Sequence, residues 1–129
     1  MSPELFQNLP YNYKSDVWAL GCILYELCTL RRPFDAQFEP GLIMKVLAGS
    51  FAPINSMYSK PLRDLVARTL SLKSEDRPSI KEILLIPFIK KRALKYLDEC
   101  LKQPDIDKVM YYVRIDVYSK FKRTRNTLK

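Results

Sequence analysis

Apolar side chains in residues 1–102 recur mainly three and four positions apart, which is the spacing of one face of an α-helix. Capping and stop signals set the expected ends of these helices, such as Ser79 three residues before Glu82. One helix is expected to begin at Ser2-Pro3-Glu4, and the others to cover about 15–30, 41–48, 59–70, 79–86 and 88–102. Residues 50–58 fit no regular element, so the body of the chain is predicted to be all-α.

The segment from Ser15 to Leu30 differs from the other expected helices because it is apolar on almost every face. A helix of this kind is typically buried, with other helices packed around it. We therefore expect it to be the central helix of the fold, ended by Arg31-Arg32-Pro33. Its apolar residues are Val17, Trp18, Ala19, Leu20, Cys22, Ile23, Leu24 and Leu27.

Beyond Pro104 the hydrophobic pattern fits two kinds of element, and periodicity does not separate them. One interpretation is a helical stripe of Ile106, Val109, Met110, Val113 and Val117. The other is an alternating strand of Tyr111, Val113, Ile115 and Val117. Residues 118–129 hold five basic and no acidic side chains, so we expect this end of the chain to be mobile.

The 129 residues are enough for one domain or part of one, and their net charge of +8 lies mostly near the C-terminus. Residues 1–89 hold 10 basic and 9 acidic side chains, whereas residues 90–129 hold 12 basic and 5 acidic ones. The basic tail, residues 104–129, could weakly bind nucleic acid, anionic lipid or an acidic protein, or act as a localisation signal. We favour a solvated tail, because the stretch is short and has no folded basic face.

Missing residue types exclude several classes of site. The chain has no His, so it cannot carry a His-based triad or a zinc site that mixes Cys with His. Its three Gly cannot build a phosphate loop of the GxxxxGK or GxGxxG kind. Three Cys without CxxC spacing favour reduced intracellular thiols over a disulfide framework. The longest apolar run, Val17–Tyr25, is far shorter than the roughly 20 residues of a membrane span.

Three short motifs follow one another along the chain: Ser2-Pro3-Glu4, Asp16-Val17-Trp18-Ala19-Leu20-Gly21 and Asp76-Arg77-Pro78-Ser79. Together they resemble the C-terminal lobe of a eukaryotic protein kinase from its Ala-Pro-Glu-type motif onward, over residues 1 to about 89. One motif alone would be weak evidence, but the order of all three is specific. The fuller strings at 1–5, 10–16 and 25–30 are most similar to the NIMA-related (Nek) serine/threonine kinases.

The resemblance implies structural roles for five residues. Glu4 would form a buried ion pair with Arg77 and so fasten the end of the activation segment to the lobe. Asp16 would accept hydrogen bonds from the catalytic-loop backbone. Trp18 would pack in the core, and Gly21 would allow another element to approach the central helix closely.

The resemblance also implies a surface that faces substrates and regulators. The helix over residues 41–48 would be a docking surface, through Leu42, Ile43 and Val46. Glu26 matches a position that in some kinases helps to bind a basic residue of the substrate peptide. Protein substrates or regulators are therefore the expected partners.

The parts of a kinase that carry out phosphoryl transfer precede the Ser-Pro-Glu motif, and no His-Arg-Asp or Asp-Phe-Gly string occurs in this sequence. The resemblance thus implies an incomplete lobe without an N-lobe or catalytic loop, as in a partial gene model, a short transcript product or a fragment. We expect no catalytic residue and no cofactor or metal site in this chain, while a full-length parent would use ATP and magnesium.

Two functions follow from the resemblance. In the first, the chain is a fragment of a NIMA-related kinase that phosphorylates Ser or Thr of proteins in cell-cycle, centrosomal or ciliary work, in cytoplasm and nucleus. In the second, it is a catalytically inactive binding module that keeps the docking surface. In the second case part of Val17–Leu27 would be bare, because the catalytic loop and the preceding helix that cover it in kinases are missing.

The expected domain layout has three parts. Residues 1–89 would be the partial kinase domain and residues 90–103 an amphipathic helical extension. Residues 104–129 would be the basic, partly disordered tail.

Overall fold

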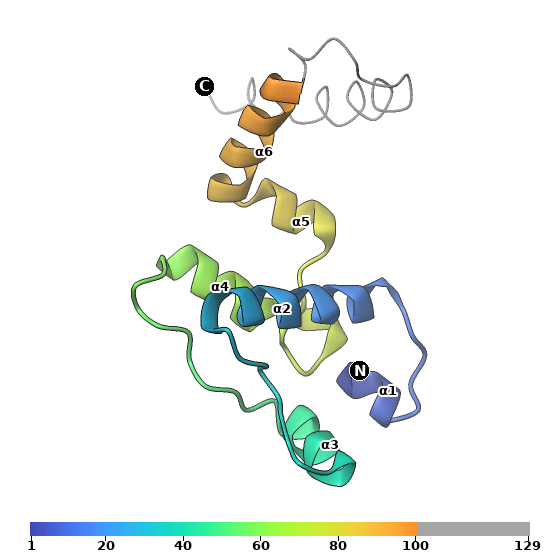
Figure 1. Ribbon diagram of the computed structural model, residues 1–129. Helices are drawn as coiled ribbons and strands as arrows, with labels where there is room; N and C mark the ends of the chain where they lie inside the picture. The colour runs from blue at the N-terminus through green and yellow to red at the C-terminus, as the bar shows by residue number, and fades with distance from the viewer. Residues whose placement is uncertain (101–129) are drawn as a thin grey trace. The chain divides into compact units, whose positions relative to one another are not determined.

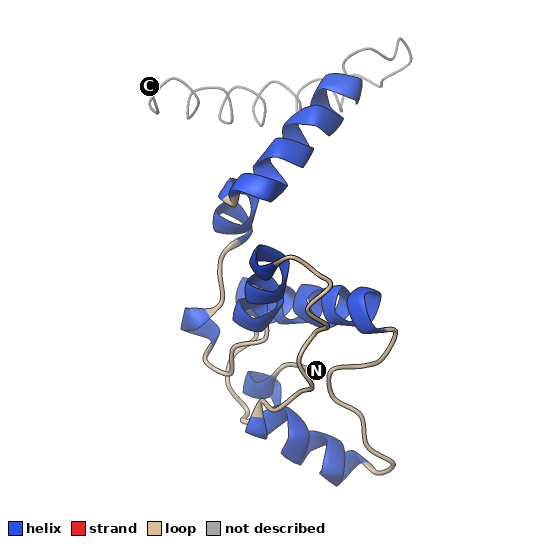
Figure 2. Cartoon of the chain, turned by 90° about the vertical axis from the view of Figure 1, so that its left-hand side faces the viewer, coloured by secondary structure: helices blue, strands red, loops and turns tan. Residues whose placement is uncertain are grey.

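A computed structural model of the chain describes residues 1–100, and every regular element in this part is helical (Figure 1). The all-α class predicted for the body is therefore confirmed, and loops alone join the helices (Figure 2). The elements are α1 (Pro3–Phe6), α2 (Tyr13–Thr29), α3 (Glu39–Ala48), α4 (Lys60–Thr69), the 3-10 helix η1 (Ser74–Asp76), α5 (Ile80–Leu85) and α6 (Pro87–Cys100). None of these described helices is long and apolar enough to cross a membrane.

Residue contacts divide the chain into two compact units, Met1–Ile83 and Leu84–Lys129. The second unit contains α6, whose exposed face carries an ion pair between Lys95 and Glu99 at 3.7 Å. The predicted domain limits at 89 and 103 remain predictions. The choice between helix and strand after Pro104, the mobile end and the anionic partner of the basic tail all lie outside the described residues.

Helix α2 begins earlier than predicted, because Asn12 caps it. The Asn12 side chain accepts a hydrogen bond from the Lys14 N–H at 2.8 Å, and the Asn12 N–H donates to the Ser15 hydroxyl at 3.4 Å. Asn is favoured both in turns and at helix N-caps, so the turn predicted around Pro10 and Asn12 passes directly into the helix. Helix α2 therefore starts at Tyr13, directly after the cap, rather than at the predicted Ser15 and Asp16.

Most other helix ends lie within two residues of their predicted positions. Helix α3 starts two residues early, at Glu39, because Pro40 is tolerated in a first turn that needs no N–H donor. It ends at Gly49, which adopts a left-handed φ of 63°. The capping box before α5 forms as predicted, with the Ser79 N–H donating to Glu82 at 2.7 Å.

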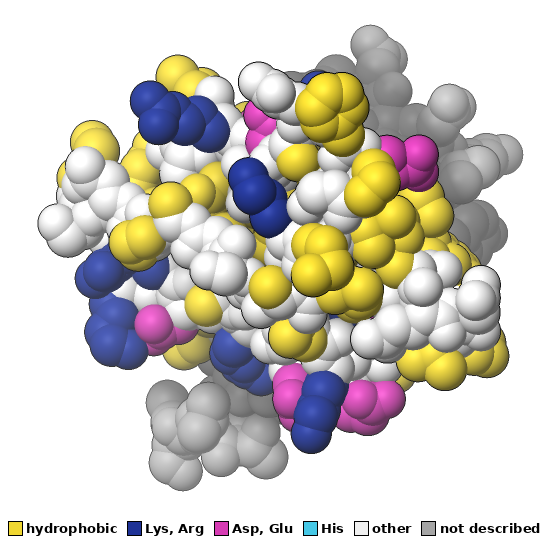
Figure 3. Space-filling model, turned by 90° about the horizontal axis from the view of Figure 1, so that it is seen from below, with side chains coloured by type: hydrophobic (Ala, Val, Ile, Leu, Met, Phe, Trp, Pro, Cys, Tyr) yellow, Lys and Arg dark blue, Asp and Glu magenta, His cyan; other side chains and the backbone are white. Residues whose placement is uncertain are grey.

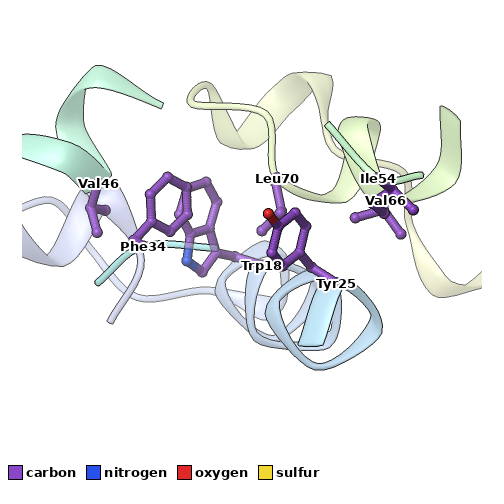
Figure 4. Packing of buried hydrophobic residues seen from close by; sticks show 7 residues of the cluster. All are labelled: Trp18, Tyr25, Phe34, Val46, Ile54, Val66 and Leu70. Carbon is purple, nitrogen blue, oxygen red and sulfur yellow. The ribbon is translucent and has the colours of Figure 1, made fainter. Parts of the chain in front are cut away.

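The hydrophobic core of the first unit forms where α2, α4 and the segment around α3 meet (Figure 4). Trp18 on α2 stacks on Phe34, with ring centroids 5.4 Å apart, and Phe51 meets both Phe34 and Tyr25 edge-on. Aromatic pairs in these geometries add stability beyond the area they bury. The buried cluster is Trp18, Tyr25, Phe34, Val46, Ile54, Val66 and Leu70.

Helix α2 is buried along one side only, so the prediction of burial on every face is wrong. Val17, Trp18, Gly21 and Tyr25 face the core, whereas the Ile23 side chain is 56% exposed. Leu27 is 69% exposed. Helix α4 and the residues around Phe34 pack against the side of α2 that carries Trp18 and Tyr25, away from Ile23 and Leu27. The bare apolar surface expected within Val17–Leu27 lies at Ile23 and Leu27.

Candidate functional site

The structure brings Glu4 and Arg77 together as a buried ion pair between the two ends of the first unit. Glu4 lies in α1, and Arg77 follows η1 directly. The pairing is bidentate: Arg77 Nη1 donates to Glu4 Oε1 and Nη2 donates to Oε2, each at 2.8 Å. The Arg77 side chain is 0% exposed. Such a fork is among the strongest hydrogen-bonded contacts that side chains make.

Every N–H donor of the Arg77 guanidinium has an acceptor. Besides the two bonds to Glu4, Nε donates to the Ser71 carbonyl at 2.8 Å, Nη1 to Lys14 at 3.0 Å and Nη2 to Leu72 at 3.0 Å. A guanidinium has five N–H donors, so its hydrogen-bonding capacity is filled. Because these carbonyls belong to α2 and to the loop after α4, one side chain joins three separate parts of the unit.

The carboxylate of Glu4 is held in its charged form by its neighbours. The Ser15 hydroxyl donates to Glu4 Oε1 at 2.6 Å, on the same oxygen that pairs with Arg77. The Arg77 guanidinium outweighs the effect of burial and, with help from Ser15, lowers the pKa of Glu4 from 4.5 to about 2. The pair therefore stays charged at every pH near neutrality.

The lowered pKa of Glu4 makes the stability of the first unit sensitive to acid. Since the folded pKa lies below the unfolded value of 4.5, the stabilisation is complete above that pH. It is lost as the pH falls toward 2, and amounts to about 3 kcal/mol. An NMR titration of the Glu4 carboxyl carbon should show a midpoint near pH 2. A midpoint above pH 4, like that of an exposed glutamate, would contradict the ion pair.

Trp18 and Gly21 support this pair from α2. The Arg77 guanidinium carbon lies 4.9 Å from the centroid of the Trp18 ring, a distance suited to a cation–π contact. Trp18 thus touches both the core and the ion pair. Gly21 faces α4, where Thr69 and Leu70 leave no room for a side chain.

Asp16 lies at the exposed start of α2, where its carboxylate accepts a hydrogen bond from the Tyr11 hydroxyl. This bond raises the pKa of Tyr11, because deprotonation would place a second negative charge beside Asp16. Asp16 also suits the first turn of a helix, where the positive end of the helix dipole stabilises acids. The catalytic-loop backbone that the resemblance assigns to Asp16 does not occur among the described residues.

The four residues expected to face substrates lie in different environments. Glu26 is exposed on α2. Leu42 and Ile43 are half-buried, and Val46 is only 4% exposed within the core cluster, where a partner cannot contact it. Val46 lies on the apolar side of α3 that the helical spacing predicted, and that side faces the core. The predicted use of Val46 in docking therefore needs correction.

The most exposed apolar residues of this region are two that the sequence analysis did not select. Phe38, which caps α3, is 76% exposed, and Met44 is 70% exposed. Figure 3 shows the face that carries α3, where hydrophobic side chains form much of the surface and basic side chains stand among them. A docking surface on α3 would therefore be built around Phe38 and Met44.

Sequence reasoning also missed the residues that complete the ion pair. Lys14 contributes its carbonyl to Arg77 and donates its ammonium to the Arg77 carbonyl. Ser15 supports Glu4 through its hydroxyl. Both residues directly precede the second motif, which begins at Asp16, and this position was the one signal that the sequence offered for them.

The predicted absence of a magnesium or ATP site in this chain stays a prediction. Within Met1–Cys100, no three His, Cys, Asp or Glu side chains lie close enough together to hold a metal ion. Neither a Gly-rich loop nor an Asp-Phe-Gly string is present to hold nucleotide phosphates. The contacts that the structure shows at Glu4 and Arg77 join separate segments of the chain.

Comparison with known proteins gives a consistent set of similarities. A family model described as protein kinase domain matches residues 1–89. Mouse (Mus musculus) serine/threonine-protein kinase Nek1 is 48% identical over 97 residues, which are 75% of this chain and 8% of that protein. Human (Homo sapiens) serine/threonine-protein kinase Nek5 is 45% identical over 97 residues, 75% of this chain and 14% of that protein. A probable serine/threonine-protein kinase nek3 of Dictyostelium discoideum is 49% identical over 90 residues, 69% of this chain and 8% of that protein.

Proposed function

Because the chain belongs to the protein kinase family, we propose that residues 1–89 form part of the C-terminal lobe of a NIMA-related serine/threonine kinase. The chain spans between 8% and 14% of the length of the three relatives named above. The whole protein would transfer the γ-phosphate of ATP to Ser or Thr of protein substrates, with ATP and magnesium bound elsewhere. The cell-cycle, centrosomal or ciliary setting that the resemblance implies is part of the same proposal.

The observation that carries this proposal is the ion pair between Glu4 and Arg77. It joins the Ser-Pro-Glu motif to the Asp-Arg-Pro motif, 73 residues away, with all five guanidinium donors in use. A lobe that must hold one end of a mobile activation segment needs a fixed point of this kind. The role of these residues is thus to fasten that segment, and their contribution to catalysis would be indirect.

Taken alone, the 129-residue polypeptide is expected to bind no Mg–ATP. A ligand at 100 times its Kd stabilises the fold that binds it by about 2.7 kcal/mol, which would raise the Tm by several degrees. Thermal unfolding with and without saturating Mg–ATP should therefore give the same Tm. Magnesium with inorganic tripolyphosphate is the control, because it supplies similar charge without adenine. A rise in Tm with Mg–ATP that tripolyphosphate does not reproduce would contradict the absence of an ATP site.

A second candidate function is a binding module without catalysis. The exposed apolar side chains of Ile23 and Leu27 on α2 favour it, since contiguous apolar surface often marks an interface. The mass of the endogenous protein captured by an antibody to residues 105–129 separates the two candidates. A species well above 15.1 kDa supports a longer kinase, whereas one at 15.1 kDa supports the module.

A further inference from the structure

An open pocket of about 500 Å³ lies beside the C-terminal half of α3, away from the Glu4–Arg77 pair. Its walls come from the loop between α2 and α3, from α3 itself and from the residues that follow it. The loop and the helix are tied together by the Lys45 ammonium, which donates to the Asp35 carbonyl at 2.5 Å. This volume lies within the range of about 300–1,000 Å³ that is typical of ligand sites.

The pocket holds two positive charges that form no ion pair within the described part of the chain. Arg32 lines it, and its side chain makes no hydrogen bond or ion pair there. Lys45 lines it as well, and its ammonium donates to a backbone carbonyl rather than to a carboxylate. The Ser50 hydroxyl adds a neutral donor, and Phe51 and Pro33 supply apolar wall. A guanidinium, an ammonium and a hydroxyl lining one pocket suit an anion with several oxygens.

We propose that this pocket binds a phosphorylated serine or threonine side chain of a partner polypeptide. A phosphate monoester carries a charge of about −1.5 to −2 and three acceptor oxygens, so it can use Arg32, Lys45 and Ser50 together. A carboxylate has half the charge and one oxygen fewer, so it leaves part of this donor set unused. The apolar wall at Phe51 and Pro33 would contact the residues that flank the phosphorylated one. This assignment goes beyond the proposed kinase function and does not depend on it.

One residue of the pocket opposes an anion, and this gives the proposal a specific test. The Asp35 carboxylate also lines the pocket and reduces its net charge to +1. The bond from Lys45 uses the Asp35 backbone, so Asp35→Asn should leave that contact intact. Asp35→Asn is therefore expected to strengthen phosphopeptide binding several-fold, by removing a like charge.

Fluorescence anisotropy of labelled peptide pools with the full 129-residue chain tests the proposal. Three pools have uncharged random flanks and a central phosphoserine, serine or glutamate. The phosphoserine pool should bind about tenfold tighter than the other two, and Arg32→Ala or Lys45→Ala should each weaken it about tenfold. Arg31→Ala is the matched control: Arg31 is exposed, adjacent and equally charged, but it does not line the pocket. Its loss should change binding less than about twofold.

Four outcomes would overturn the proposal. Equal binding of the phosphoserine and glutamate pools would mean that the pocket takes any acidic peptide. An equal effect of Arg31→Ala and Arg32→Ala would mean non-specific attraction to a basic surface. Inorganic phosphate that binds as tightly as the phosphoserine pool would mean a free-anion site. Absence of binding by all pools would remove the site altogether. None of these results alters the Mg–ATP test, so the two proposals can fail separately.

Discussion

Replacing Arg77 with alanine is expected to lower the free energy of unfolding by about 3–5 kcal/mol, because it leaves the buried Glu4 carboxylate without its cation. The carbonyls of Lys14, Ser71 and Leu72 lose a donor in the same step. Each unsatisfied buried polar group adds a cost of about 1–3 kcal/mol where water cannot replace the donor. Domains have a total stability of only about 5–15 kcal/mol, so the variant should be largely or wholly unfolded.

Urea denaturation at pH 7, followed by circular dichroism, measures this loss. Arg68→Ala is the control, since it removes an exposed arginine from α4 and should cost less than about 0.5 kcal/mol. Glu4→Gln is a milder change that keeps one acceptor oxygen, so it should remain measurable if Arg77→Ala does not fold. Replacing both Glu4 and Arg77 by methionine should cost less than the two single changes together, because no charge is left unpaired. A loss below about 1 kcal/mol for Arg77→Ala would refute the structural role of the pair.

The sequence was sufficient to predict most of the helices and one long-range contact. The spacing of Leu62, Leu65 and Val66 predicts α4, and the Ser79–Glu82 box predicts the start of α5. Both signals are local, since they join residues within about one turn of helix. Glu4 and Arg77 are 73 residues apart, and only the order of the motifs around them indicated that they meet.

Other contacts of the site could not be predicted, for reasons that follow from their chemistry. The acceptors of Arg77 at Lys14, Ser71 and Leu72 are backbone carbonyls, which every residue possesses and no residue type marks. Arg32 and Lys45 line one pocket because the loop after α2 folds back on α3. The distribution of charges along the sequence does not indicate that the loop folds in this way. The one-sided burial of α2 depends on which elements are present to cover it, and an apolar composition does not contain that information.

The close approach of α2 to α4 predicts a second large effect. A Cβ atom at Gly21 would lie 2.5 Å from Thr69 Oγ1, 2.9 Å from Thr69 Cβ and 3.0 Å from Leu70 Cδ2. Thr69 is fully buried, and its hydroxyl donates to the Val66 carbonyl at 2.8 Å, so it cannot turn away without losing a bond. Gly21→Ala should therefore force the two helices apart and cost at least about 2 kcal/mol. This loss exceeds the gain of about 1 kcal/mol that alanine brings to a helix interior.

Gly41→Ala provides the matched control for this prediction, because Gly41 also lies in a helix but a Cβ there would make only an ordinary van der Waals contact. The nearest atom to a Cβ at that position is Ala36 Cβ, at 3.4 Å. Gly41→Ala should therefore stabilise the chain by about 0.5–1 kcal/mol through helix propensity alone. In urea denaturation the same chemical change should thus alter the free energy of unfolding with opposite signs at the two sites.

Combining Gly21→Ala with Thr69→Ala removes the shortest contact and should recover part of the loss. Equal stabilisation at both glycines would mean that α2 and α4 do not approach as closely as the structure shows.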